Sequence, residues 1–300
     1  MSIKSFSLAK KVSSNTPVLS LSQLSALKKD PMKTHQNIPS KYELYELSVQ
    51  SPDTHAEWFD QIYSNTFGKK AYQLREDFCG TFQLSCEWIK LRSKNTALGL
   101  DLDPEPISYG MKHHFLKLTP HQKKRLKIKQ KNVLTATQEK TDLIVACNFS
   151  FCIFKKRDQL IRYFKSCHKS LNSKGMLLLE IAGGPGMIAP MREKKEVKRN
   201  RTEKFTYIWH QKSFDPITHD AHYSIHFKLS NGKTLKDQFT YDWRLWSIPE
   251  LRDALDEAGF KETIVYWETE HEGEGTDEYV PTENGDNSYA WVAYVLGVKR

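Results

Sequence analysis

Apolar residues recur with two different periods along this chain, and the period changes near Gly183. Before Gly183, short apolar runs alternate with stretches in which the apolar residues stand three and four apart. The runs predict strands and the stretches predict helices. We expect strands at residues 71–78, 97–102, 126–133, 142–147 and 176–181, and helices at residues 53–67, 83–91, 104–118 and 157–171.

Strands that alternate with helices of this length indicate a parallel sheet with helices on both faces. After Gly183, apolar and polar residues alternate by two, which predicts an antiparallel meander. The alternating segments are residues 205–214, 221–229 and 235–246. A capping box at Ser247 and Glu250 opens a last helix. That helix, and two final strands on either side of an acidic loop, cover residues 251–258, 263–267 and 290–296.

This pattern divides the chain into four parts. We expect a basic tail at residues 1–41, a strand–helix core at 42–182, the antiparallel insertion at 183–246, and a helix and strand pair at 247–300 that completes the core sheet. The chain is 39% hydrophobic and 12% aromatic, as is typical of folded globular proteins. Its longest mostly apolar run, residues 143–154, is shorter than the roughly 20 residues of a membrane span, so we expect no such span.

The cysteines and the charge distribution indicate the cellular compartment and the class of binding partner. Five cysteines without a C-x-x-C pair favour reduced thiols, and the N-terminus lacks the apolar segment of a secretory signal. We therefore expect a cytoplasmic protein with no metal site. The net charge of +9 is local, because residues 121–131 carry +6, residues 192–204 carry +4 and residues 268–286 carry −8. A uniformly basic surface for nucleic acid is not implied.

Two features place a ligand at one edge of the predicted sheet, where the carboxyl ends of parallel strands form binding sites. Residues 76–81 run from a strand through a tight turn into a helix. Gly80 lets the backbone of that turn approach a ligand closely, and the free amides of the helix start favour a negative group. Asp101 ends the next strand, 25 residues after Glu76. A carboxylate there can accept both hydroxyls of a ribose, so we expect a nucleotide-derived ligand.

A dinucleotide is not the expected ligand, because its fingerprint is G-x-G-x-x-G and this chain has Phe78 and Phe82 where further glycines would fall. The segments LREDFCGTFQLSCEWI, ALGLDLDPEPI, KNVL, DLIVACNFSF and SLNSKGMLLLEI resemble the class I S-adenosylmethionine-dependent methyltransferases. The resemblance extends over about residues 42–298. It implies an α/β fold, a seven-stranded Rossmann-like sheet with helices on both faces and an antiparallel β insertion before the last helix. The family's first motif has the order G-x-G-x-G, so Phe82 has the size to narrow or cover the cofactor pocket.

The resemblance also implies S-adenosyl-L-methionine as the cofactor and S-adenosyl-L-homocysteine as its product. The residues that match the family's cofactor site are Tyr45, Arg75, Glu76, Asp77, Gly80, Asp101, Leu102, Asn132, Val133, Cys147, Asn148 and Phe149. Among them, Glu76 and the Gly80 turn match the motif that holds the methionine moiety, and Asp101 matches the ribose-binding acid. Residues 102, 132 and 133 match the surroundings of the adenine. Residues 147–149 match the strand end that faces the sulfonium and the incoming substrate.

Several of these side chains have a functional and a purely structural interpretation. Arg75 either pairs with the cofactor carboxylate or is a solvated charge at a strand end. Tyr42 and Tyr45 either close over the cofactor or pack against the sheet edge. Residues 148–151 either grip a planar amino group or form a strand end with core aromatics. The candidate substrate contacts are Tyr42, Phe151, Arg244 and Trp246, with Trp243 as a further pocket wall.

Methyl transfer from a sulfonium is an in-line displacement in which the protein mainly positions and desolvates the reactants, so we assign no catalytic residue. We expect transfer to a small-molecule acceptor. One alternative is an RNA or protein methyltransferase that uses the basic segments 121–131 and 192–204, although nucleic acid is not the favoured partner. Another is a cofactor-binding protein without transferase activity, because two motif glycines are missing. The sequence does not specify the acceptor or the oligomeric state.

Overall fold

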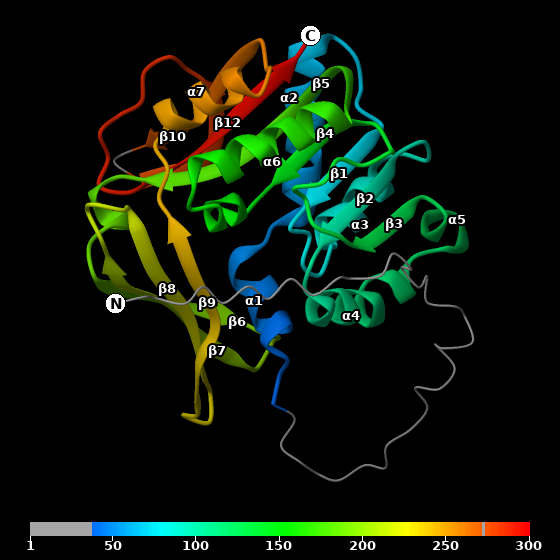
Figure 1. Cartoon of the computed structure of the whole chain (residues 1–300). Coiled ribbons are helices and arrows are strands. Elements are labelled where there is room, and N and C mark those ends of the chain that lie inside the picture. The colour runs from blue at the N-terminus through cyan, green and yellow to red at the C-terminus, as the bar shows by residue number, and fades with distance from the viewer. Residues whose placement is uncertain (1–37, 272–273) are drawn as a thin grey trace, which may run out of the picture. The chain divides into compact units, whose positions relative to one another are not determined.

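A computed structural model describes residues 38–271 and 274–300, of which Ser40–Arg300 form one compact unit. Most of the predicted basic tail, residues 1–41, lies outside the described residues. The described unit contains a central sheet of eight strands and a second sheet of four strands (Figure 1).

The central sheet combines parallel and antiparallel strands. Its strands are β1 (Gln73–Asp77), β2 (Thr96–Asp101), β3 (Leu126–Gln130), β4 (Thr141–Ala146), β5 (Leu171–Gly183), β10 (Glu262–His271), β11 (Glu274–Pro281) and β12 (Trp291–Lys299). Their order is β11-β10-β12-β5-β4-β1-β2-β3, parallel from β3 to β5 and antiparallel beyond β5. The α/β prediction with a parallel core and a last antiparallel strand pair is confirmed.

An eighth strand, β11, occupies part of the segment that we expected to be an acidic loop. Polar side chains stabilise the β10–β11 hairpin where apolar alternation is missing. The hydroxyls of Thr269 and Thr276 lie 2.5 Å apart, and the Thr269 hydroxyl also donates to the carbonyl of Glu278 at 3.2 Å. Because a strand of this kind has no apolar signal, the sequence pattern does not predict it.

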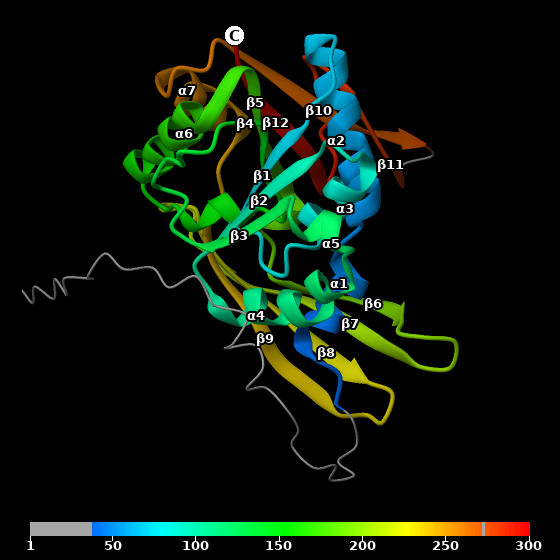
Figure 2. The same ribbon diagram turned by 90° about the vertical axis from the view of Figure 1, so that its right-hand side faces the viewer.

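Helices cover both faces of the central sheet, as the apolar periodicity predicts (Figure 2). One face carries α2 (Pro52–Phe67) and α3 (Gln83–Leu91), and the other carries α6 (Arg157–Ser170) and α7 (Ile248–Glu257). The helix predicted to run to residue 118 is instead α4 (Pro104–His113), a 3-10 turn at Phe115–Lys117, and α5 (Pro120–Lys123). A capping box between Thr119 and Gln122 starts α5 as a separate helix.

The antiparallel insertion follows β5 through a short 3-10 turn, Pro185–Met187, and therefore lies at the carboxyl edge of the central sheet (Figure 2). Its strands pair in sequence order and are β6 (Met191–Lys198), β7 (Lys204–Phe214), β8 (Asp220–Leu229) and β9 (Thr234–Arg244). The three predicted strands are confirmed. The additional strand β6 pairs with β7. It was not predicted, because most of its residues are exposed and charged and show no apolar alternation.

Helix α1 (Lys41–Val49) connects the insertion to the carboxyl edge of the central sheet. Its N-cap, Ser40, accepts a hydrogen bond from the backbone of residue 42. Leu44 is fully buried in a cluster with Phe227 of the insertion. On its other side, Glu46 accepts a hydrogen bond of 2.5 Å from the hydroxyl of Thr81, next to the turn after β1. Tertiary contacts of this kind hold α1 as a helix, since its sequence has little amphipathic periodicity.

Candidate functional site

The carboxyl ends of β1, β2 and β4 meet at one edge of the central sheet, because β1 pairs in parallel with both neighbours. After β1 the chain turns at Gly80, which has a left-handed φ of +51°. The Gly80 amide donates to Oδ2 of Asp101 at 2.7 Å, and the amide of Asp103 donates to Oδ1 at 2.9 Å. A Cβ at Gly80 would meet no heavy atom within 4 Å, so the outer side of the turn has room for a ligand.

Phe78 and Phe82 adopt the backbone conformation that the missing motif glycines would supply. Their φ values are +56° and +50°, in the left-handed region that favours glycine. The Phe78 ring packs near Phe154, whereas Phe82 is fully buried on the other face of the sheet. A Cβ added at Gly110 of α4 would come within 2.4 Å of the Phe82 ring. The Phe82 ring therefore fills the core beneath α4 rather than covering the Gly80 turn.

Glu76 fixes the start of α3 beside this turn. Its Oε2 accepts hydrogen bonds from the amide of Ser85 at 2.9 Å and from the Ser85 hydroxyl at 2.6 Å. Burial raises the pKa of Glu76 to about 7, although the Ser85 bonds oppose this shift. The carboxyl group thus holds strand, turn and helix together at the predicted methionine-binding motif.

Arg75 and Asp77 do not face a ligand, which corrects the prediction for both residues. Both side chains have 0% exposure. Arg75 Nε donates to Asp77 Oδ1 at 2.6 Å, and Arg75 Nη2 donates to Asp77 Oδ2 at 2.9 Å. The hydroxyl of Tyr163 on α6 adds a bond of 2.9 Å to Asp77. Alternate residues of a strand point to the same face, so positions 75 and 77 pair inside the core while Glu76 faces the other way.

The three residues expected around an adenine differ in their accessibility. Leu102 is 58% exposed at the end of β2 and is open to a ligand. Asn132 lies at the surface after β3, where its Oδ1 accepts from the amide of Leu134 at 2.9 Å. Val133 is buried, and its carbonyl accepts a bond of 2.8 Å from the hydroxyl of Ser166. Its side chain is therefore a core contact, whereas the prediction for residue 133 concerns its backbone amide, which a buried side chain does not exclude.

The segment after β4 has an unusual backbone and a carboxyl partner that we did not predict. Asn148 and Phe149 are consecutive non-glycine residues with positive φ, +54° and +56°. The Asn148 amide donates to Oε2 of Glu180, on β5, at 2.5 Å. Burial raises the pKa of Glu180 to about 7, and burial also raises the pKa of the neighbouring Cys147 thiol, which stays protonated at neutral pH. A lone acid within the apolar run of β5 is the sequence signal for Glu180.

The raised pKa of Glu180 predicts a pH-dependent stability. In the unfolded chain this carboxyl has its ordinary pKa near 4.5, so the folded state binds the proton more tightly. The stabilisation is present in full below that value and is lost as the pH rises through about 7. We expect the free energy of unfolding to fall between pH 5 and pH 8, by up to about 3 kcal/mol from this group.

Urea unfolding across this pH range tests that prediction. Glu180→Gln keeps an acceptor oxygen for the Asn148 amide but does not titrate, so its stability should depend less on pH than that of the wild type. Glu87→Gln removes a partly exposed carboxyl on α3 and should keep the wild-type dependence. Equal pH dependence in the wild type and Glu180→Gln would contradict the prediction.

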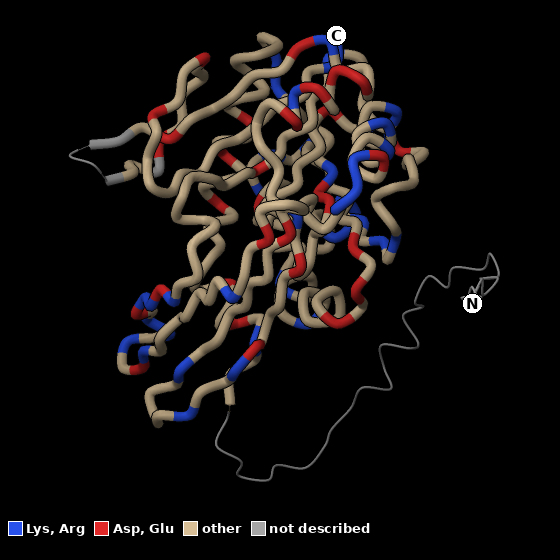
Figure 3. Tube along the Cα trace, turned by 60° about the vertical axis from the view of Figure 1, so that its left-hand side comes forward, with Lys and Arg blue, Asp and Glu red and all other residues tan. Residues whose placement is uncertain are grey.

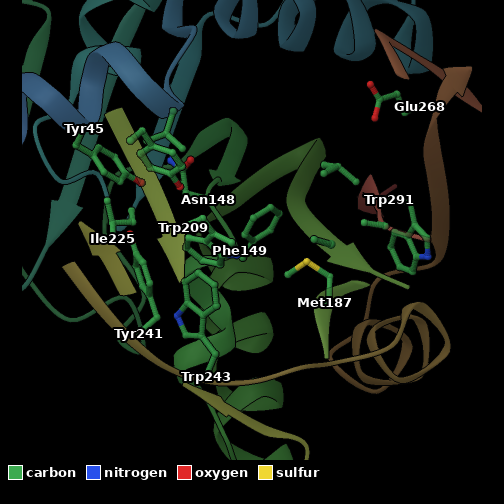
Figure 4. A pocket seen from close by; sticks show the side chains of 15 residues that line it. Tyr45, Asn148, Phe149, Met187, Trp209, Ile225, Tyr241, Trp243, Glu268 and Trp291 are labelled. Carbon is green, nitrogen blue, oxygen red and sulfur yellow. The ribbon is translucent and has the colours of Figure 1, made fainter. Parts of the chain in front are cut away.

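A cavity of about 290 Å³ lies between this segment and the insertion (Figure 4). Its aromatic lining residues are Tyr45, Phe149, Tyr207, Trp209, Tyr241, Trp243 and Trp291. The side chains of Tyr45 and Tyr241 share a hydrogen bond, and burial raises the pKa of both, so both hydroxyls are neutral at ordinary pH. Asn148 and Phe149 also line the cavity, which places it next to the end of β4.

No protein-family model and no curated protein matches this sequence. Solved structures with the same fold include DesVI from Streptomyces venezuelae, with 16% identity, a TM-score of 0.63, and coverage of 86% of this chain and 97% of that chain. The sugar N-methyltransferase KedS8 from a Streptoalloteichus species has 16% identity and a TM-score of 0.60, with 91% and 98% coverage. CalS10, an amino pentose methyltransferase from Micromonospora echinaspora solved with bound S-adenosylmethionine, has 15% identity and a TM-score of 0.60, with 89% and 100% coverage.

The chain has the fold of S-adenosylmethionine-dependent methyltransferases. This methyltransferase fold confirms the predicted fold class, including the insertion between β5 and α7. No helix in the part of the chain that the structure describes is long and apolar enough to cross a bilayer.

Within the methyltransferase fold, the four predicted substrate contacts lie outside the large cavity. Tyr42 packs against Tyr109 of α4 at a centroid distance of 5.2 Å, and Phe151 is fully buried in the core. The Arg244 guanidinium stacks 3.8 Å above the Trp246 ring and donates to Glu250 at 3.0 Å. Trp246 is buried and donates to the carbonyl of residue 154 at 3.1 Å. These contacts favour the structural interpretation of all four.

The cavity is instead built by residues that the sequence pattern hardly distinguishes. Four of the predicted candidates line it, namely Tyr45, Asn148, Phe149 and Trp243. Tyr207 and Trp209 lie on β7 and Tyr241 lies on β9, with β8 between them. The register through β8 places all three on one face of that sheet. The available signal is an aromatic residue at every second position within residues 205–209 of β7 and 239–243 of β9, which on its own also fits an ordinary hydrophobic face.

Proposed function

We propose that this protein is an S-adenosylmethionine-dependent methyltransferase that acts on a small-molecule acceptor. The observation that supports it most is the pairing of the Gly80 amide with the Asp101 carboxylate at the carboxyl edge of a methyltransferase sheet. The aromatic cavity adjoins the same edge through Asn148 and Phe149. The solved structures of similar fold include sugar and amino pentose methyltransferases, in agreement with a small acceptor.

The residues at this edge fit the cofactor in part. The open side of the Gly80 turn leaves room for a carboxylate next to backbone amides, and the partly exposed Asp101 carboxylate fits a ribose diol. The exposed Leu102 would contact the adenine. Arg75 and Asp77 are not part of this set, because their charges satisfy each other in the core.

The chain's own contribution to the reaction is positioning. The bound cofactor supplies an electrophilic methyl group, and the protein must align an acceptor atom with it and exclude water. The aromatic walls of the cavity exclude water from an acceptor held beside Asn148. The protonated thiol of Cys147 and the neutral hydroxyls of Tyr45 and Tyr241 do not compete as nucleophiles.

Calorimetry with S-adenosylhomocysteine tests this function. Wild-type protein should bind the ligand, and Asp101→Ala should weaken binding by about 100-fold, because two charge-assisted hydrogen bonds to the ribose are lost at roughly 1.5 kcal/mol each. Asp103→Asn is the matched control, since it changes a neighbouring exposed carboxylate that caps α4. No binding to the wild type, or equal losses in both variants, would contradict the proposal.

The basic segments give less support to an RNA-binding function. In segment 121–131, Arg125 Nη1 donates to the carbonyl oxygens of Ile89, Arg92 and Asn95, so it holds the end of α3. Segment 192–204 lies on β6 and the start of β7, where Figure 3 shows acidic and basic residues interspersed. The ion pair of Arg199 with Glu43, at 2.8 Å, is one example. A binding protein without transferase activity would bind S-adenosylhomocysteine in the same assay but transfer no methyl group.

A further inference from the structure

Glu180 lies at the carboxyl edge of the central sheet, on the strand beside β4, and the cofactor site does not use it. The register pairs Glu76 with Val145 and Val145 with Leu178. Glu180 is two residues after Leu178, so its side chain points to the same face of the sheet as Glu76. Burial raises the pKa of the Cys147 thiol, and the charges of Glu180 and Glu76 raise it further, so this thiol lies near both carboxyl groups.

The carboxyl group of Glu180 lies where the cavity meets the cofactor edge. The cavity adjoins that edge at Asn148, so the reacting atom of an acceptor held in the cavity must lie beside this residue. Oε2 of Glu180 is 2.5 Å from the Asn148 amide nitrogen. Ala182 lines the cavity two residues after Glu180, on the same face of β5. Burial, with a further contribution from the Glu180 charge, raises the pKa of Tyr45, another lining residue.

This carboxyl group has an oxygen to offer to a ligand. Glu180 is partly exposed, and no hydrogen bond from the described residues reaches its Oε1. In the part of the chain that the structure describes, no lysine, arginine or histidine forms an ion pair with Glu180 or Glu76. Arg75, on β1, is buried with Asp77 on the opposite face. The reacting end of the acceptor site therefore has carboxyl groups without a cation of its own.

These groups favour one class of reacting atom. A carboxylate or phenolate acceptor would meet like charge, and the described lining of the cavity contains no lysine or arginine to offset it. An alcohol holds its proton too tightly for a carboxylate to remove it efficiently. An amine arrives at neutral pH as an ammonium ion, which a carboxylate attracts, and it reacts after it has lost one proton.

The rest of the cavity suits an apolar ring. Trp209, Tyr241 and Trp243 form a contiguous wall, with centroid distances of 5.8 Å from Trp209 to Tyr241 and 4.3 Å from Tyr241 to Trp243. Aromatic faces of this kind stack favourably on another ring. The volume of about 290 Å³ equals about ten water molecules at roughly 30 Å³ each, which leaves room for a ring with a short substituent.

We propose that the acceptor is an amine whose nitrogen contacts Glu180 beside Asn148, with its apolar body in the aromatic cavity. This assignment rests on the proposed function, because it takes the cavity as the acceptor site. The Glu180 carboxylate accepts one proton from the ammonium group. The neutral nitrogen then forms a bond to the methyl carbon of the cofactor, while the carbon–sulfur bond breaks and its electron pair stays on sulfur. The methylated nitrogen carries the positive charge, and Glu180 releases its proton to water.

Calorimetry with three probes tests the assignment on protein saturated with S-adenosylhomocysteine. Benzylamine, benzyl alcohol and phenylacetate share one ring and differ in the group that they bring to Glu180. At pH 8 we expect benzylamine to bind about ten-fold more tightly than benzyl alcohol, as one hydrogen bond between charged groups provides. Phenylacetate should show no heat of binding at the same concentrations.

The affinity for benzylamine should also depend on pH. It should rise about ten-fold between pH 6 and pH 8, because the ionised fraction of a carboxyl group with a pKa of about 7 rises from about a tenth to about nine tenths. Benzylamine stays protonated in this range. The Cys147 thiol and the hydroxyls of Tyr45 and Tyr294 face Glu180 and stay neutral, because burial raises their pKa values. Glu76 has a pKa of about 7 as well, so a variant of Glu180 must separate the two groups.

Glu180→Gln is that variant, since it keeps an oxygen for the Asn148 amide but carries no charge. It should lower the affinity for benzylamine to that for benzyl alcohol and abolish the pH dependence. Binding of benzyl alcohol and of S-adenosylhomocysteine should stay unchanged. Glu87→Gln, on the surface of α3, should bind every probe like the wild type. The melting temperature of each variant shows that it is folded.

The outcomes separate this proposal from the proposed function. If S-adenosylhomocysteine binds but benzylamine binds no better than benzyl alcohol or phenylacetate, the amine assignment alone is wrong. Unchanged benzylamine binding in Glu180→Gln would overturn it too, and loss of benzyl alcohol in the same variant would show that Glu180 only holds the Asn148 turn. Should Glu180→Gln fail to fold, a pH-independent affinity in the wild type would overturn the assignment. Failure of the wild type to bind S-adenosylhomocysteine would instead overturn the proposed function.

Discussion

Asp77→Ala should lower the free energy of unfolding by about 3–5 kcal/mol, which is a large fraction of the stability of a typical domain. The two contacts of Arg75 with Asp77 lie in a region with no access to water. Without the carboxylate, the guanidinium would stay buried as an uncompensated charge. Arg75 Nη1 already has no hydrogen-bond partner among the described residues, so the site offers few alternatives.

Urea unfolding measures this effect, and two further variants test its cause. Glu87→Ala breaks the ion pair with Lys90 on the surface of α3, and should change stability by less than about 1 kcal/mol. The double replacement Arg75→Met with Asp77→Leu removes both charges and should recover most of the loss, because apolar residues of similar volume replace buried ion pairs well. A loss below about 1 kcal/mol in Asp77→Ala would show that the pair is not buried as described.

The parts of the fold that the sequence predicts are those in which each element carries its own apolar signal. Strands β4 and β5 are buried on both faces and therefore read as continuous apolar runs. The location of Gly80 and Asp101 at one edge follows from the length of a strand–helix–strand unit. Elements that depend on contacts made elsewhere in the chain, such as α1 and β6, lack this signal.

In the candidate site, too, the features with a local sequence signal were predicted and those that depend on distant contacts were not. The Gly80 turn and Asp101 were predicted to lie at one edge of the sheet, whereas the hydrogen bond of 2.7 Å that connects them was not predicted. The burial of Arg75 was not predicted, since a charged residue beside a binding motif can face either the ligand or the core. Its partner two residues later on the same strand is the one local indication of core pairing. The aromatic cavity depends on how the insertion packs against β4, which no local pattern specifies.

Phe82→Gly should leave the protein more stable than Phe82→Ala by about 1 kcal/mol, although both variants should be less stable than the wild type. Each replacement loses the fully buried ring, at about 3–5 kcal/mol. Only glycine relieves the left-handed φ of +50°, which costs other residues roughly 1–2 kcal/mol. Residue 82 is also the N-cap of α3, a position where glycine is better than alanine.

The order of glycine and alanine at this position is the decisive measurement, because it reverses the usual preference for alanine. Glu87 in the same helix provides the comparison, and there Glu87→Ala should be more stable than Glu87→Gly by about 1 kcal/mol. Denaturant unfolding of the four variants gives both differences. If alanine were the more stable replacement at residue 82 as well, the turn would not have the glycine-like conformation that makes room for a ligand at Gly80.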